Sequence, residues 1–385
     1  MANTLTLTGL TEILFQARDI VAREAVGFIP SVTVNKGSEA VSLGGTVASI
    51  VTAQPTLNTS HTPAMTVPSG DDATVTTLTT TIGQVARTNI PIVGEVAKQL
   101  INIAEYGHVI LDLFSQHIRT IVNGIESHTG TVIKNGSSRA LGTAGTTPFA
   151  SSHALIPQTN QILTDNGAPN DGQRSLILTN SATTNLKLLS NIYKVNESGT
   201  GDVLNRGVLI DIDGVKIRNS AGVASHTKGT GASYLVNQSG LTTGSTSVTV
   251  DTGSGTVLAG DIVTFASGTG SGYNYVVNSA LASNAFTLAK PGLRGNIADN
   301  NAITVGNDYS GNVLFHRSAV ELIMRPPAMP EGGDAATDVM DIYDEVSGLS
   351  FQVRIYKGYG MNLMEFVCYY QAKVWKNEFV ATLLG

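Results

Sequence analysis

Residues 92–129, IVGEVAKQLINIAEYGHVILDLFSQHIRTIVNGIESHT, are the one long segment of the chain whose apolar residues recur with a helical period. Steps of three or four residues, or sums of these, place them on one face of a helix. This stripe consists of Val93, Ala97, Leu100, Ala104, Leu111, Phe114, Ile118, Ile121 and Ile125. Such a helix extends roughly 50 Å, which is longer than one compact core covers. We therefore expect a spine helix against which separate layers pack.

The composition limits the classes of function. The 385 residues are 42% hydrophobic and only 14% charged, so Gly, Ser, Thr and Asn must cover much of the surface. Low charge weakens the repulsion that keeps freely diffusing molecules apart, which suits a protein covered by neighbours. The net charge of -6 argues against a polyanion-binding role, because neutralising phosphates needs clustered Lys and Arg.

The single cysteine excludes an internal disulfide. Cys368 lies in the apolar run 366–370, where a buried, inert thiol is expected. No stretch is long and apolar enough to span a membrane, and residues 1–7 lack the basic start of a signal peptide. We expect a chain that is made and kept in the cytoplasm.

Two segments before the spine have apolar residues without an obvious partner. Residues 9–26 predict an amphipathic helix, which must dock either on its own chain or on a neighbouring subunit. Residues 46–51 and 74–84 are rich in Thr, Val and Ile and predict the two strands of a long arm. An isolated ribbon of this kind is marginal in water, so we expect its strands to lie on another subunit.

After the spine, residues 134–147 predict a loop, and an α/β alternation follows. We expect helices at 157–163 and 182–189, a strand at 175–178, and a hairpin of 208–212 with 215–218. The turn of this hairpin, Asp213-Gly214, favours a type I′ geometry because both residues tolerate positive φ.

Short aliphatic runs separated by Gly, Ser and Asn turns then predict a small all-β barrel or sandwich between about residues 225 and 308. The runs are 247–250, 261–265, 273–277, 285–288 and 302–305. The α/β pattern then resumes with a strand at 312–315, a further apolar element at 319–324, and two long strand-like runs at 349–357 and 363–374. The β unit is therefore an insertion within one α/β domain.

The sequence of these parts resembles the major capsid protein of tailed bacteriophages, which has the Hong Kong 97-like fold. The run 348–360, GLSFQVRIYKGYG, continuing to Val374-Trp375, is similar to the closing strands of that family. The inserted unit, with GDIVTF at 260–265, resembles the insertion domain of short-tailed phage coat proteins. The resemblance covers nearly the whole chain and is architectural.

The resemblance implies an α+β Hong Kong 97-like fold divided into segments along the chain. These are an N-terminal arm and helix at 1–40, an extended β loop at 41–90, a peripheral domain with the spine helix at 91–147, a first part of the axial domain at 148–228, an inserted β-barrel-like domain at 229–308, and the remainder of the axial and peripheral domains at 309–385.

The resemblance also implies a function and partners. The chain would be a structural protein that assembles into pentamers and hexamers of an icosahedral virion shell around double-stranded DNA, in the host cytoplasm. A scaffolding protein, a portal protein and a cement or decoration protein are the expected partners, and DNA would be contacted non-specifically. The family's namesake links subunits through a lysine in the extended loop, but residues 43–86 contain no lysine. Non-covalent clamping or a cement protein is expected instead.

No motif points to catalysis, a cofactor or a metal. His108, His117 and His128 share the spine without a carboxylate that would complete a metal motif. Asp211 and Asp213 lack the remaining ligands of a calcium loop. The glycine-rich run 268–272 has no following Lys-Ser/Thr, and no nucleophile elbow is present. We expect no enzyme activity.

We therefore predict contacts between subunits through the arm and the terminal helix, which would bury apolar area at roughly 25 cal/mol per Å². The residues predicted to carry these contacts are Leu14, Phe15, Val47, Ile50, Val51, Val75, Leu78 and Ile82. Two alternatives stay open. One is an encapsulin-like nanocompartment shell, and the other is a β-rich surface or adhesive protein, which should carry a secretion signal.

Overall fold

The computed structural model describes residues 13–18, 20, 27–37, 39–52, 57, 59, 63, 65, 75–94, 106–189, 211–238, 240–343 and 350–385. Its helices and strands mix along the chain, which confirms the α+β class. The bounded helices are α3 (Tyr106–Asn135), α4 (Leu155–Asp165) and α5 (Asn180–Leu188), and the 3-10 turns are η1 (Ile29–Ser31), η2 (Arg317–Ala319) and η3 (Asn377–Phe379).

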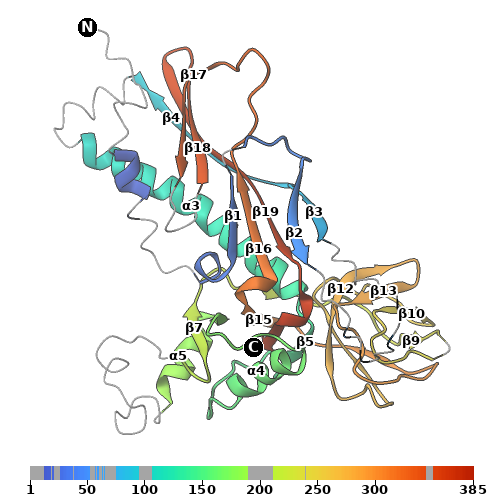
Figure 1. The fold of residues 1–385 in the computed structure, drawn as a ribbon. Helices are drawn as coiled ribbons and strands as arrows, with labels where there is room; N and C mark the ends of the chain where they lie inside the picture. Colours follow the sequence, from blue (N-terminus) through green and yellow to red (C-terminus); the bar gives the residue numbers. More distant parts are fainter. Residues whose placement is uncertain are drawn as a thin grey trace.

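The first sheet and the long helix form the main core. The order of the sheet is β1 (Thr33–Lys36), β16 (Val320–Arg325), β19 (Met361–Val374), β18 (Ser350–Lys357) and β17 (Ala336–Tyr343), with β4 (Gln84–Val93) also beside β19. Helix α3 runs the length of one face of this sheet (Figure 1). Phe114 of α3 packs edge-on against Phe366 of β19, with ring centroids 5.7 Å apart. The expected spine helix is therefore confirmed.

The bounds of the spine differ from the prediction at both ends. Ile92 and Val93 belong to β4, where they pair with Asn362 and Met361, so a helix beginning at residue 92 was wrong. Pairing with a strand about 270 residues away overrides the local helical period. Residues 95–105 lie outside the described residues. The helix continues past residue 129 to Asn135, because Ile133 extends the buried stripe.

The second sheet holds the α/β part of the chain. Its first strands, in order, are β7 (Val215–Asn219), β6 (Arg174–Leu178), β15 (Tyr309–His316), β20 (Val380–Leu384) and β5 (Arg139–Leu141). Helices α4 and α5 and strand β6 confirm the predicted alternation. Asp213 and Gly214 have φ of 56° and 71°, which confirms the predicted turn. The strand expected before this turn lies largely outside the described residues.

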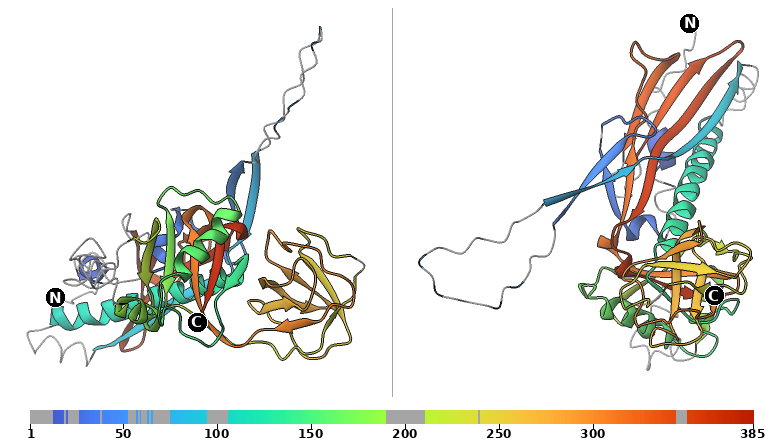
Figure 2. Two further views of the ribbon diagram at one scale, coloured as in Figure 1. Left: turned by 90° about the horizontal axis from the view of Figure 1, so that it is seen from below. Right: turned by 90° about the vertical axis from the view of Figure 1, so that its right-hand side faces the viewer.

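Residues 234–238 and 240–305 form an all-β body with its own hydrophobic core, seen at one side of the molecule in Figure 2. That this body is an insertion domain stays a prediction. The last five of its strands overlap the five predicted runs, and the first was not predicted. They are β9 (Leu235–Val236), β10 (Ser247–Asp251), β11 (Ile262–Phe265), β12 (Asn274–Ala282), β13 (Ala285–Leu288) and β14 (Ile303–Val305). Tyr275 of β12 pairs with Arg139 of β5, so the sheet continues from the α/β part into the insertion.

The third sheet is a ribbon of β2 (Thr46–Thr52) and β3 (Val75–Thr81), as predicted. The pairing is antiparallel and runs from Thr46 opposite Thr81 to Thr52 opposite Val75. Figure 2 shows the two strands leaving the body at a steep angle. We call residues 46–52 and 75–81 the arm.

Several elements were missed by sequence reasoning. Residues 134–147 are not wholly a loop, because they include the end of α3 and strand β5. Strands β1, β17 and β20 were not predicted, and the short β8 (Ser225–His226) pairs with β15. Within the described part of the chain, no helix is both long enough and apolar enough to cross a membrane.

Candidate functional site

The base of the arm is held by backbone hydrogen bonds. The amide of Gly44 donates to the carbonyl of Ile82, and the amide of Ile82 donates to the carbonyl of Gly45, both at 2.9 Å. Beside them, the amide of Gly83 donates to the side-chain oxygen of Gln371 in β19 at 3.2 Å. These bonds close the ribbon where it meets the body and attach it to the main sheet.

The carboxylate of Glu321, in β16, holds the arm in the direction in which it leaves the body. Glu321 accepts hydrogen bonds from the hydroxyl of Ser49, the indole N–H of Trp375 and the side-chain amide of Asn35, each at 2.6 Å. Charge-assisted bonds of this kind are short and stronger than neutral ones. Ser49 is the arm residue in this cluster, so the direction of β2 depends on side chains far away in the sequence.

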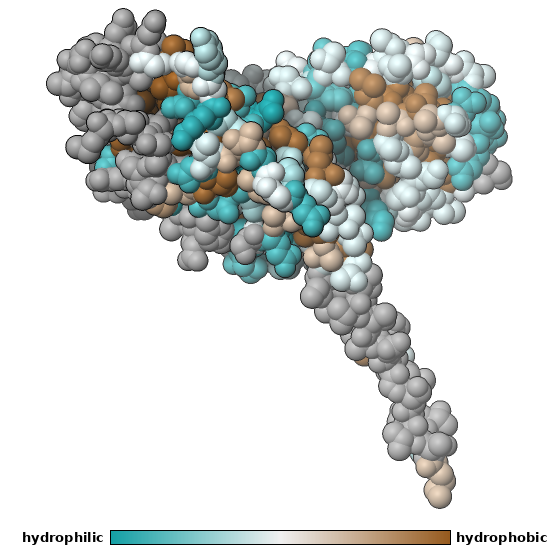
Figure 3. Space-filling model, turned by 90° about the horizontal axis from the view of Figure 1, so that it is seen from above, coloured by the Kyte–Doolittle hydropathy of each residue, from teal (hydrophilic) through white to brown (hydrophobic). Residues whose placement is uncertain are grey.

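The register of the arm divides its side chains between two faces. Val47 pairs with Thr80 and Ser49 pairs with Leu78, and these neighbouring pairs lie on the face that reaches Glu321. Val47 and Leu78 are half-buried in the isolated chain. In Figure 3, brown hydrophobic residues on this side of the molecule lie in small patches among paler and teal ones. The predicted contact residues of the arm therefore do not form one continuous apolar face.

The remaining predicted contact residues differ in how far their side chains are buried within the chain itself. Ile82 is fully buried at the base of the arm, and Leu14 is fully buried in the main core, so neither presents a free side chain to a neighbour. Residues 13–18 and 20 are helical, and the apolar stripe of this helix docks on its own chain. Phe15 remains 37% exposed, with the guanidinium of Arg18 4.8 Å from its ring centroid. The side chains of Ile50, Val51 and Val75 lie outside the described part of the structure.

A buried glutamate ties the segment after the terminal helix to the spine. Glu126 of α3 accepts hydrogen bonds from the backbone N–H groups of Gly27, Phe28 and Ile29 at 2.6–2.9 Å. It also accepts one from the hydroxyl of Ser220 at 2.8 Å. The signal in the sequence was a charged residue next to Ile125 on the buried stripe, which requires compensating donors.

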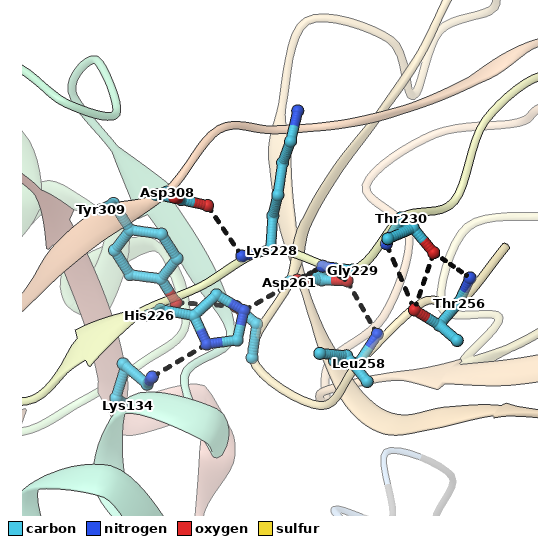
Figure 4. Close-up of polar contacts among 11 residues, drawn as sticks. Lys134, His226, Lys228, Gly229, Thr230, Thr256, Leu258, Asp261, Asp308 and Tyr309 are labelled. Carbon is cyan, nitrogen blue, oxygen red and sulfur yellow. Dashed lines mark hydrogen bonds and ion pairs between the residues drawn. The ribbon is translucent and has the colours of Figure 1, made fainter.

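A second buried polar cluster lies where the inserted domain joins the rest of the chain (Figure 4). Lys134, at the end of α3, has its ammonium nitrogen 3.0 Å from Nδ1 of His226. Nε2 of His226 is 2.7 Å from Oδ1 of Asp261, immediately before β11. Tyr309, at the start of β15, donates its hydroxyl hydrogen to the carbonyl of Gly260 at 2.6 Å. We call Lys134, His226, Asp261 and Tyr309 the joint cluster.

Burial changes the acid–base properties of this cluster. Lys134 is only 3% exposed, and desolvation lowers the pKa of its ammonium group to about 8, although Asp261 nearby raises it. Burial, followed by the charge of Asp261, raises the pKa of the Tyr309 hydroxyl well above its usual range. Sequence reasoning missed all four residues, because they are brought together from positions up to about 175 residues apart.

Two histidines of the spine pack their imidazole rings against aromatic side chains of β19. His117 stacks on Phe366 with ring centroids 6.5 Å apart, and His128 lies edge-on to Tyr370 at 5.4 Å. Desolvation lowers the pKa of both imidazoles. The side chain of His108 lies outside the described residues. Among the residues that the structure describes, no three His, Cys, Asp or Glu side chains form a group that could hold a metal.

The remaining candidates from the sequence have structural roles. Asp213 accepts a hydrogen bond from the side-chain amide of Asn160 at 2.8 Å. Cys368 is fully buried in β19, and burial raises the pKa of its thiol to about 12, which confirms the expected inert cysteine.

Comparison with known proteins gives matches only among solved structures. No family model and no curated protein matches the chain. A structure from Mycobacterium phage Che8 is 12% identical, with a TM-score of 0.46 over 93% of this chain and 90% of that one. The capsid of cyanophage P-SCSP1u is also 12% identical, with a TM-score of 0.46 over 94% and 88%. A virus-like particle from Pyrococcus furiosus is 7% identical, with a TM-score of 0.44 over 97% and 98%. These values are too low to establish a shared fold.

Proposed function

We propose that the chain is the major capsid protein of a tailed bacteriophage, with a Hong Kong 97-like fold. The observation that carries this proposal is the arm: its base is fixed to the body by hydrogen bonds, yet its strands form a sheet of only two. One face of this ribbon reaches the body, but the opposite face, which carries Ala48, Thr77 and Thr79, is exposed, and a two-stranded ribbon is marginal in water by itself. A neighbouring copy of the chain supplies a surface that covers this exposed face.

The arrangement of the arm suits a closed assembly. Its direction is set by Glu321, so each copy presents the ribbon at a defined angle to the next copy. Repetition of one such contact around a rotation axis gives rings, and rings of five and six close an icosahedral shell. Many contacts, each burying a modest apolar area, then stabilise the shell together.

The division of the chain follows from this proposal with one adjustment. Residues 1–40 form an N-terminal arm and helix, which are distinct from the two-stranded ribbon that we call the arm. Residues 91–147 include the spine of a peripheral domain. Because β4 pairs with β19 along ten residues, we end the extended loop at residue 83 and assign residues 84–90 to the same domain as β19. Residues 148–228 and 309–385 form the axial domain and complete the peripheral one. Residues 229–308 form an insertion like that of short-tailed phage coat proteins.

The proposed partners are further copies of the chain, a scaffolding protein, a portal protein and a cement or decoration protein. The net charge of -6 favours weak, non-specific contact with packaged DNA over tight binding. The proposed location is the virion, after assembly in the host cytoplasm. We propose no catalytic role.

Electron microscopy of the purified full-length chain tests the proposal, with the chain expressed alone and together with candidate scaffolding proteins. Closed shells of uniform diameter, with five-fold and six-fold clusters, are the expected result. Soluble monomers under every condition would overturn the proposal. Shells that form without scaffold and load a foreign enzyme through a short peptide would instead identify an encapsulin-like compartment.

A further inference from the structure

The joint cluster occupies the point where the chain crosses between the inserted domain and the rest of the molecule. The chain leaves the body through His226 in β8 and returns through Tyr309 in β15, and these two residues are directly paired across the two strands. Lys134 reaches them from the C-terminal end of α3, and Asp261 reaches them from the inserted domain (Figure 4). The cluster therefore connects the spine, both crossing strands and the insertion.

The donors and acceptors in this cluster determine the state of His226. The ammonium group of Lys134 can only donate, so Nδ1 of His226 must accept its hydrogen bond. The ring hydrogen then lies on Nε2 and is donated to Oδ1 of Asp261. The carboxylate of Asp261 also accepts from the backbone N–H groups of Gly229 at 3.1 Å and Leu258 at 2.7 Å. This pattern of donors and acceptors corresponds to a cation, a neutral imidazole and an anion in sequence.

We infer that the joint cluster is a proton-controlled joint, in which protonation of His226 loosens the attachment of the inserted domain. A proton on Nδ1 removes the acceptor that the described structure gives to the Lys134 ammonium. It also places two cationic groups in contact, with Asp261 balancing only one of them. A buried charge without a partner is costly, so separating α3 from the insertion becomes favourable in acid.

Among the described residues around His226, Asp261 is the one anion, and the ring of Tyr309, whose centroid lies 5.6 Å from the Lys134 ammonium nitrogen, offers only a weaker contact for a cation. Lys134 faces His226 from α3, Asp261 from the loop before β11, and Tyr309 from β15, with its ring centroid 5.1 Å from that of His226. Two residues after His226, just beyond the end of β8, Lys228 is exposed and donates its backbone N–H to Asp308. His226 is 8% exposed and Asp261 is 1% exposed, so water reaches the cluster poorly.

Close packing makes this attachment sensitive to small movements. Gly260, next to Asp261, has φ of +94°, and a Cβ at this position would lie 2.5 Å from Oδ1 of Asn135 and 3.1 Å from Cε1 of His226. The insertion thus meets the end of α3 through a residue without a side chain. Because this contact is close-packed, Lys134 and a protonated His226 cannot move apart unless the insertion moves relative to α3.

Hydrogen–deuterium exchange of the full-length, unassembled chain tests this inference at about pH 7.5 and about pH 5, with rates corrected for the pH dependence of intrinsic exchange. The reporters are peptides that contain the amides of Gly229 and Leu258, both of which donate to Asp261. We expect about tenfold faster exchange of these amides in acid. The amides of α3 around Ile121 should keep their protection.

Two variants separate the proposed mechanism from general acid sensitivity. Lys134→Met removes the opposing cation, and His226→Asn keeps an acceptor for Lys134 but cannot be protonated. Whichever of the two folds should show no acid response at Gly229 and Leu258. The matched control Lys228→Met removes an exposed lysine at the same junction and should respond like the wild type. Exchange rates of the wild type that do not change in acid would overturn the inference, and so would Lys134→Met or His226→Asn variants that respond like the wild type. The test does not depend on whether the chain forms shells.

Discussion

The hydroxyl of Ser49 in the arm donates a hydrogen bond of 2.6 Å to the carboxylate of Glu321, 272 residues later in the chain. The same oxygen of Glu321 accepts from the indole of Trp375, and the other oxygen accepts from Asn35. One side chain of the main sheet thus determines where an otherwise unsupported ribbon starts. The direction of the arm therefore depends on side chains of the folded body as well as on Ser49 in the arm itself.

Replacing Glu321 with alanine should free the arm and lower the stability of the body. Three donors lose their acceptor, and we expect a loss of about 2 kcal/mol in the free energy of unfolding. Urea denaturation measures this loss, and limited proteolysis should show faster cleavage within residues 46–81. Glu331→Ala, at an exposed glutamate, is the control. Cleavage at the wild-type rate in Glu321→Ala would show that other contacts orient the arm.

Leu78→Asp should leave a folded subunit that assembles poorly. Leu78 is half-buried on the arm face that includes Ser49, and a carboxylate there would have to lose its water when a neighbour covers it. Circular dichroism checks the fold, and sedimentation velocity measures the assembled fraction. Leu188→Asp makes the same change at an exposed leucine of α5 and should assemble normally. Normal shells from Leu78→Asp would remove this side chain from the subunit contact.

Glu126→Ala should be among the most destabilising single changes in the chain. It leaves three buried backbone N–H groups and the hydroxyl of Ser220 without their acceptor. We expect a loss of about 3–5 kcal/mol, measured by chemical denaturation. Ser220→Ala removes only one donor and should cost about 1 kcal/mol. If the two variants were equally stable, water or another group would have to replace the carboxylate.

The buried ammonium of Lys134 predicts a rise in stability at alkaline pH. Its pKa is about 8 in the folded protein and 10.5 in the unfolded chain, so between these values the unfolded state binds more protons. Stability therefore increases with pH across this window, by about 3 kcal/mol in total. The difference in unfolding free energy between the wild type and Lys134→Met, measured at several pH values, isolates this contribution. A difference that does not change from pH 8 to pH 10.5 would contradict it.

Cys368 should be unreactive in the native protein. Its thiol is fully buried with a pKa raised to about 12, so hardly any thiolate forms at moderately alkaline pH. Labelling with a thiol reagent should proceed only after denaturant is added. Rapid labelling of the native chain would mean that β19 opens locally.

Local patterns in the sequence predicted those parts of the fold whose partners lie nearby along the chain. In the all-β unit, β12 pairs with its sequence neighbours β11 and β13, so their aliphatic runs and turns were sufficient to predict these strands. The turn at Asp213-Gly214 was predicted because both residues tolerate positive φ. In each case the residues that decide the structure are adjacent.

The failures involve partners that are distant in sequence. Ile92 continues a helical period, but the ladder with Asn362 makes it part of a strand. For Leu14 a subunit contact was predicted from the local helical period, which carries no information on the main core of its own chain, where the side chain is buried. The joint cluster could not be predicted, because nothing near Lys134 in sequence indicates that His226 and Asp261 will meet it. Burial and long-range pairing decide these positions.

The strands of the arm contain no Asp, Glu, Lys, Arg or His: they read TVASIVT at 46–52 and VTTLTTT at 75–81. Association through these strands would hardly respond to ionic strength, since there is no charge to screen. Its driving force would be the release of water from apolar and hydroxyl-bearing surface, which strengthens on warming. Particles held together by this ribbon should therefore resist high salt and loosen in the cold.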